Sequence, residues 1–133
     1  MLKLRTFAIV FALAVSPVLA APKAVQQAKE LLALWQPEAV SLKGSTLTLV
    51  LPERQLTEQI YLAVIETGIC AGVLTGKPLP GVSSIEVLNQ LSRQGYVYEA
   101  GIEDCTQIND LPVGDRIGTL LVLGETHVFS AFK

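Results

Sequence analysis

The sequence predicts an α+β fold: an antiparallel sheet of four to five strands, with a long buried helix and an N-terminal amphipathic helix packed on one face. Three features of the chain lead to this fold class. Residues 23–35 show helical spacing, residues 60–74 are apolar nearly all round, and short β-like runs separated by turn residues follow. When strands are grouped after helices in this way, the helices pack on one side of an antiparallel sheet.

The first twenty residues have the pattern of a cleaved secretory signal. Lys3 and Arg5 precede an apolar run, and Val18 and Ala20 stand three and one positions before the expected cut. The run is too short to cross the ~30 Å of hydrocarbon in a bilayer. We therefore expect residues 1–20 to be a signal peptide and residues 21–133 to be a single α+β domain. We expect that domain to be periplasmic or secreted, with no integral membrane span after cleavage.

The charge of the chain bears on its partners. The formal net charge of the whole chain is −2, from ten basic and twelve acidic residues. The leader takes two of the basic residues and no acidic one, so the mature chain carries −4. A weakly acidic chain lacks the clustered Lys and Arg that nucleic-acid binding requires, and we expect no nucleic-acid partner.

Cys70 and Cys105 are the two cysteines of the chain. In an oxidising compartment an even number favours pairing, and only one intramolecular pair can form. The bridge would close a loop of about 36 residues and stabilise the fold by roughly 3–4 kcal/mol in the chain-entropy model. A redox pair is the alternative, but the chain has no C-x-x-C motif. We predict a structural disulfide.

Two helices are predicted before the strands. Residues 23–35 carry apolar side chains on one helical face, and Pro37 ends this helix because the residue before a proline is driven out of helical dihedral angles. Residues 57–75 form the second helix, which must be buried on most sides because it is apolar around most of its circumference. Its Gly68 and Gly72 lie four apart, where we expect a sheet or another helix to approach closely.

Five segments have the composition of strands: residues 45–51, 82–89, 95–100, 117–123 and 128–132. Gly124-Glu125 then predicts a two-residue hairpin turn between the last two strands. The polar segment 101–115 is expected to be a loop that the disulfide ties to the central helix.

Residues 82–91 fit two structures. A capping-box pattern at residues 83–86 and apolar residues at helical spacing favour a helix. The β-branched residues of the segment, and the need of the strand at 95–100 for a neighbour, favour a strand. We adopt the strand for residues 82–89.

Candidate catalytic residues are few. His127 is the only histidine, and catalysis by it would need a substrate proton or nucleophile within reach and an orienting carboxylate. The serines lack the G-x-S-x-G context of a hydrolase nucleophile. The acidic residues lack the spacing of a calcium-binding loop. One histidine and two paired cysteines are too few ligands for a zinc site. We therefore assign no catalytic residue, no metal and no cofactor.

Tyr96, Tyr98 and Glu99 are the candidate binding residues. Alternation along the strand at 95–100 puts the two tyrosines on one face and Glu99 on the other. Exposed tyrosines are common at binding surfaces, although tyrosines also pack between a sheet and a helix. The function we favour is therefore a non-enzymatic binding or accessory protein of the cell envelope. Its partner would be an envelope or extracellular protein that docks on the sheet face or edge around these three residues.

Two alternatives remain open on the sequence. The chain could be a small secreted hydrolase or hydrolase inhibitor that uses His127 with an acidic residue, although an enzyme is the less favoured class. If the last strand, which ends at Phe132, lies at a sheet edge, it could also pair with a second copy to form a homodimer.

Overall fold

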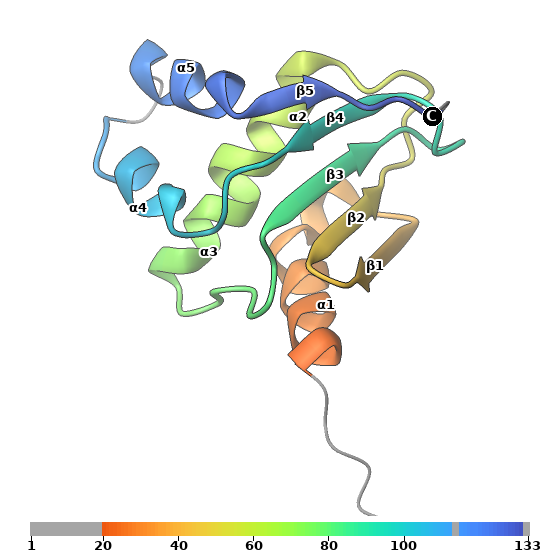
Figure 1. Ribbon diagram of the computed structural model, residues 1–133, viewed down its shortest axis with the longest axis horizontal. Coiled ribbons are helices and arrows are strands. Elements are labelled where there is room, and N and C mark those ends of the chain that lie inside the picture. The colour runs from red at the N-terminus through yellow and green to blue at the C-terminus, as the bar shows by residue number, and fades with distance from the viewer. Residues whose placement is uncertain (1–19, 113–114, 132–133) are drawn as a thin grey trace, which may run out of the picture.

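The computed structural model describes residues 20–112 and 115–131 of the chain. The leader predicted at residues 1–20 therefore lies outside the described residues, apart from Ala20. The described chain has an α+β fold with one five-stranded sheet and four helical units (Figure 1). Its elements in chain order are α1 (Ala20–Leu31), η1 (Ala33–Trp35), β1 (Ala39–Lys43), β2 (Thr46–Val50), α2 (Glu58–Ala63), η2 (Val64–Cys70), α3 (Ala71–Leu74), β3 (Ser84–Leu88), β4 (Gly95–Tyr98), α4 (Asp104–Asn109), α5 (Arg116–Gly124) and β5 (Thr126–Val128).

The sheet is mixed, which corrects the prediction of an antiparallel sheet. Its strands lie side by side in the order β1-β2-β3-β4-β5, and β2 pairs with β3 in parallel, whereas the other three pairs are antiparallel. The cause is the connection between β2 and β3, which contains the whole central helix. A helical crossover of this kind returns the chain to the same edge, so that the next strand runs in the same direction.

Three predicted strands are present, and one strand was not predicted. The segments predicted at 45–51, 82–89 and 95–100 correspond to β2, β3 and β4. The additional strand β1 forms a tight hairpin with β2, in which Lys43 is paired with Thr46. Gly44 makes this turn with φ of +60°, a conformation that glycine adopts without steric cost.

The strand predicted at residues 117–123 is wrong, because these residues form the helix α5. Asp115 caps the helix, since its Oδ1 accepts a hydrogen bond from the Ile117 amide at 2.8 Å. Gly118 and Val122, four residues apart, are buried, while the Leu120 side chain is 66% exposed. The hairpin predicted at Gly124-Glu125 is therefore absent, and the last strand is β5, a short edge strand, rather than residues 128–132. The segment predicted as a loop at 101–115 also contains a helix, α4.

The central helix is built from α2, the π-helical segment η2 and α3. It begins at Thr57, whose hydroxyl accepts a hydrogen bond from the Ile60 amide at 3.2 Å. Its middle is buried against the sheet on one side and α1 on the other. Among the described residues, no helix combines the length and hydrophobicity needed to cross a bilayer.

The close approach predicted at Gly68 and Gly72 is confirmed, and the approaching element is α1 with the turn that follows it. A Cβ atom at Gly68 would lie 2.8 Å from Leu32 Cδ2 and 3.3 Å from Trp35 Cζ3. A Cβ atom at Gly72 would overlap the Leu31 side chain. The two glycines thus give up helix propensity, about 1 kcal/mol each, so that the side chains of Leu31, Leu32 and Trp35 can pack against the backbone of the central helix.

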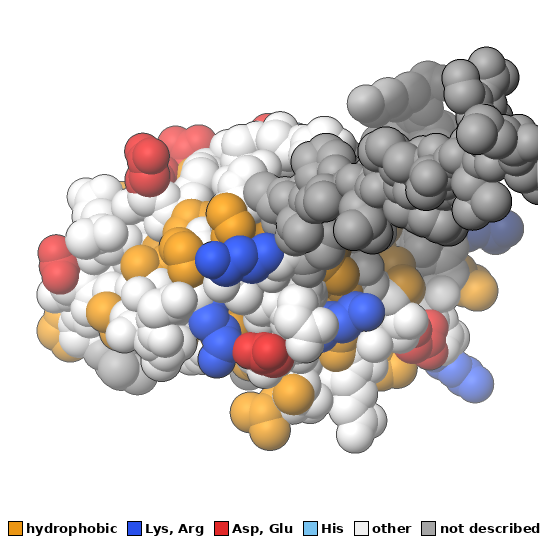
Figure 2. Space-filling view, turned by 90° about the horizontal axis from the view of Figure 1, so that it is seen from below, with side chains coloured by type: hydrophobic (Ala, Val, Ile, Leu, Met, Phe, Trp, Pro, Cys, Tyr) orange, Lys and Arg blue, Asp and Glu red, His pale blue; other side chains and the backbone are white. Residues whose placement is uncertain are grey.

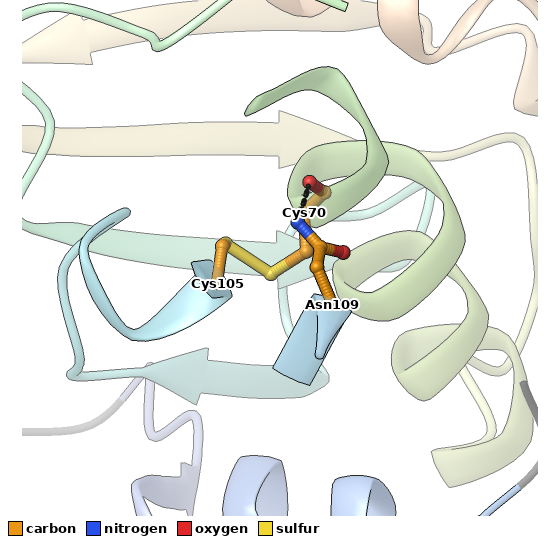
Figure 3. The surroundings of a disulfide bond; sticks show 3 residues. All are labelled: Cys70, Cys105 and Asn109. Carbon is orange, nitrogen blue, oxygen red and sulfur yellow. Dashed lines mark hydrogen bonds between the residues drawn. A yellow bond between two sulfur atoms is a disulfide. The ribbon is translucent and has the colours of Figure 1, made fainter. Parts of the chain in front are cut away.

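The predicted disulfide between Cys70 and Cys105 is present, and it joins η2 to α4 (Figure 3). Both cysteines are fully buried. Beside the bridge, the Asn109 side-chain amide donates a hydrogen bond to the Cys70 carbonyl at 2.9 Å. The short helix α4 is thus fixed to the central helix by one covalent bond and one hydrogen bond within a single turn.

Replacing Gly68 with Ala should destabilise the protein, because Leu32 is fully buried and has little room to move. Overpacking of this kind costs roughly 1–3 kcal/mol and outweighs the helix-propensity gain of about 1 kcal/mol. Urea unfolding measures the effect. The matched control is Gly124→Ala, where a Cβ atom meets nothing within 4 Å. The close-packing account fails if Gly68→Ala is as stable as the unmodified protein.

Candidate functional site

The helices cover one face of the sheet, and the opposite face carries a group of polar residues. On the covered face, Leu47, Leu49, Ile85 and Val87 are completely buried. In Figure 1, α1 and α2 pass behind the strands, so the opposite face is turned toward the viewer. We call this opposite face the polar sheet face. Its residues alternate with those that face the helices and include Thr46, Thr48, Ser84, Glu86, Val97, Glu99 and His127, and in β1 Ser41 and Lys43, which pair with Thr48 and Thr46.

Strand register brings the residues of the polar sheet face together. Thr48 is paired with Glu86, Glu86 with Val97 and Val97 with His127, so these four residues form one row across four strands. Directly paired side chains on one face of a sheet are close enough to interact. Glu99 follows Val97 on the same face of its strand, which places it next to His127.

A hydrogen bond holds one carboxylate of this face, and the other lies beside the histidine. The Thr48 hydroxyl donates to Glu86 Oε1 at 3.1 Å. His127 Nδ1 lies 3.5 Å from Glu99 Oε1, and their side chains are 57% and 53% exposed, respectively. Part of the face forms a hollow of about 280 Å³. Two carboxylates at this hollow can accept hydrogen bonds from a positively charged or donor-rich partner.

The structure separates the three predicted binding residues. Tyr98 is 1% exposed, and Tyr96 stacks on Tyr61 of α2 with ring centroids 5.0 Å apart, so both tyrosines face the helices. Glu99 lies on the other side of the sheet and is exposed. Of the predicted contact residues, only Glu99 therefore belongs to the polar sheet face, where its neighbour is His127.

Tyr61, which stacks on Tyr96 of β4, takes part in a hydrogen-bond chain. The Thr126 hydroxyl donates to the Val122 carbonyl at 2.6 Å, so its oxygen is left to accept the Tyr61 hydroxyl, also at 2.6 Å. Burial raises the pKa of Tyr61, and the hydrogen bond with Thr126 offsets part of that effect. This chain joins α2, α5 and β5, which is a structural role.

Sequence analysis did not single out Glu86, Thr48 and Ser84. The alternation within the strand could have identified them, because Ser84 and Glu86 alternate with the buried Ile85 and Val87. Ser84 and Thr46 share a hydrogen bond of 2.9 Å between their hydroxyl groups. Within the described ranges, no three His, Cys, Asp or Glu side chains come together as metal ligands.

The side of the molecule seen in Figure 2 differs from the polar sheet face. There, hydrophobic, basic and acidic side chains are interspersed outside the grey residues. Among the described residues visible there, neither sign of charge dominates.

The fold and the site define a small disulfide-bonded α+β protein with a polar sheet face that no helix of the described residues covers. Comparisons of this chain with protein-family models, with curated proteins and with solved structures find no match.

Alkaline unfolding should report the burial of Tyr98. Burial, and then the nearby carboxylates of Asp104 and Glu125, raise the pKa of Tyr98 from 10.0 to about 12. Between these values the folded protein keeps the phenolic proton while the unfolded chain loses it, so the free energy of unfolding falls as pH rises through this range. Tyr98→Phe should lessen that fall. Urea unfolding at neutral pH and at about pH 11 measures it, and equal losses in both proteins would contradict the assignment.

Proposed function

We propose that this protein is an exported, non-enzymatic binding domain of the cell envelope that contacts a protein partner through the polar sheet face. One observation carries the proposal. Glu86, Glu99 and His127 come from three neighbouring strands and meet on a sheet face that no described helix covers. The carboxylates select a partner that presents Lys or Arg side chains at the contact.

Two observations support export. The pattern of residues 1–20 places the expected cut directly after Ala20. The Cys70–Cys105 disulfide suits an oxidising compartment such as the periplasm or the extracellular space. Mass spectrometry of the protein recovered outside the cytoplasm should find a chain that begins at Ala21.

The exposure of the site favours a macromolecular partner. The side chains of Glu99 and His127 at the hollow are more than half exposed. Charged side chains that are exposed in this way can meet a complementary protein surface. Charged groups at such a surface raise the association rate and select the partner, and salt screens their effect. β5 lies at an edge of the sheet, so a second copy of the chain is the alternative partner.

The double substitution Glu86→Gln/Glu99→Gln should weaken partner capture from an envelope extract. We expect at least about threefold less bound partner, and release of the partner from the unmodified protein in about 0.5 M NaCl, because exposed charges dominate the contact. Quantitative affinity capture with mass spectrometry measures both effects.

The control for this experiment is Glu58→Gln/Glu103→Gln, which makes the same change in net charge at exposed positions on other elements. If both double variants lose the partner equally, net charge rather than the polar sheet face is responsible. If neither loses it, the proposed surface is wrong.

One contact favours a second candidate, a small hydrolase or hydrolase inhibitor. His127 Nδ1 lies 3.5 Å from Glu99 Oε1, which is the arrangement of a general base with an orienting carboxylate. The Ser84 hydroxyl of the same face is occupied with Thr46. We rank this candidate second because both members of the pair are open to solvent, whereas a catalytic pair gains strength in a site from which water is excluded.

His127→Ala separates the two candidates. A general base contributes about 10²–10⁴-fold to a rate, so a hydrolase should lose that much activity while its thermal unfolding stays unchanged. The binding proposal expects the unmodified protein to show no turnover that depends on His127. A screen with ester, peptide and glycoside substrates provides the measurement.

A further inference from the structure

A groove of about 230 Å³ lies between the central helix and the helices α4 and α5. It shares no lining residue with the hollow on the polar sheet face. Its walls are mostly apolar and include Leu74, Ile108, Leu111 and Pro112, while Glu66 and Asp115 add two carboxyl groups. A mostly apolar concavity with a few polar groups is the usual form of a small-molecule site.

Glu66 is the distinctive residue of this groove. It is the single acidic side chain of η2, and its Oε1 atom is buried without a hydrogen-bond partner in the described structure. Gly118 of α5 lies close by, because a Cβ atom there would stand 3.9 Å from this oxygen. η2 is a π-helical segment, a type of backbone irregularity that is frequent at functional sites.

The buried oxygen makes a bound donor favourable. Leaving a buried acceptor without a partner costs free energy, and the cost is greater for a charged group. Burial raises the pKa of Glu66, and a hydrogen bond with Thr119 offsets part of this rise. A positively charged donor in the groove beside this carboxyl group would favour its ionised form and offset part of the cost.

The charge of the lining indicates which donor fits. Glu66 and Asp115 line the groove, and neither Lys nor Arg is among its described lining residues. The volume is below the ~300–1,000 Å³ of common drug-sized sites, so the ligand must be compact. We propose that this groove binds a small primary amine with an apolar body, whose ammonium group pairs with the Glu66 carboxylate and whose body lies against Leu74, Ile108 and Leu111.

The groove is held in shape before any ligand binds. α4, which provides Ile108, is joined to the central helix by the Cys70–Cys105 bridge and by the Asn109 hydrogen bond to the Cys70 carbonyl. α5 is fixed at its start by the Asp115 cap. A preformed site loses less free energy in ordering side chains when a ligand binds.

Amide NMR titration of the disulfide-bonded protein tests the proposal. The probes are benzylamine and 3-methylbutylamine, with benzyl alcohol and 3-methylbutanol as neutral counterparts of the same shape. We expect saturable shifts around Thr67, Asn109 and Gly118 with a dissociation constant at or below about 1 mM for at least one amine. The matching alcohol should bind at least about tenfold more weakly, because it lacks the charge-assisted hydrogen bond.

Two variants make the test specific. Glu66→Gln removes the charge at nearly constant shape, relieves a burial cost and should therefore fold, and it should weaken amine binding at least about tenfold. Gly118→Val keeps the charge but places a larger side chain between Glu66 and Leu111, and it should also block binding. The control Glu58→Gln should bind like the unmodified protein.

Three outcomes would overturn the proposal. These are the absence of saturable binding by either amine, equal affinity for amine and alcohol, and unchanged amine affinity in Glu66→Gln. None of them bears on the polar sheet face, whose variants change Glu86 and Glu99.

Discussion

The helical segment from Glu58 to Leu74 has to be buried on three sides, and the rest of the structure is arranged around that requirement. The sheet covers one side through residues such as Leu49 and Ile85, and α1 covers a second side at Gly68 and Gly72. α4 and α5 cover the third side, where the Cys70–Cys105 bridge fixes α4. Because these partners all gather around one helix, the other face of the sheet is left without a described helix, and its alternate residues are polar.

The parts of the fold that the sequence predicts are those in which local pattern and burial agree. The central helix, β2 and the contact at Gly68 belong to this class. α5 does not, because a run of apolar residues from Ile117 to Leu123 suits a strand and a buried helix equally. Its structure is decided by contacts outside the run, namely the Asp115 cap and the hydrogen bond from Thr126 to the Val122 carbonyl. β1 escaped prediction for a related reason, since its half-polar sequence becomes a strand only through its pairing with β2.

The site was partly predictable for the same reason. Alternation correctly put Tyr96 and Tyr98 on one face of β4 and Glu99 on the other, but it does not say which face the helices cover. Tyrosine suits either environment, because its ring packs in a core and its hydroxyl can find a partner there. The neighbouring strands decide the matter, since Ile85 pairs with Tyr98 and is completely buried. Which face the helices cover thus depends on the whole sheet and not on one strand. The contact between Glu99 and His127 depends on the register between β4 and β5, which the sequence of neither strand predicts alone.

The carboxylates of this small protein lie in two different environments, and each environment suits a different kind of binding partner. Glu86 and Glu99 lie on an open surface, where water and salt weaken each charge, so they suit selection and steering of a large partner. Glu66 is partly buried, with its Oε1 atom shielded from water, in the middle of the most apolar segment of the chain. The core does not need this carboxylate, because a buried charge without a complete set of partners lowers stability relative to an apolar side chain. Its presence there is explained if the missing partner is a bound ligand, and the same desolvation that makes Glu66 costly to the fold makes its hydrogen bond to that ligand strong.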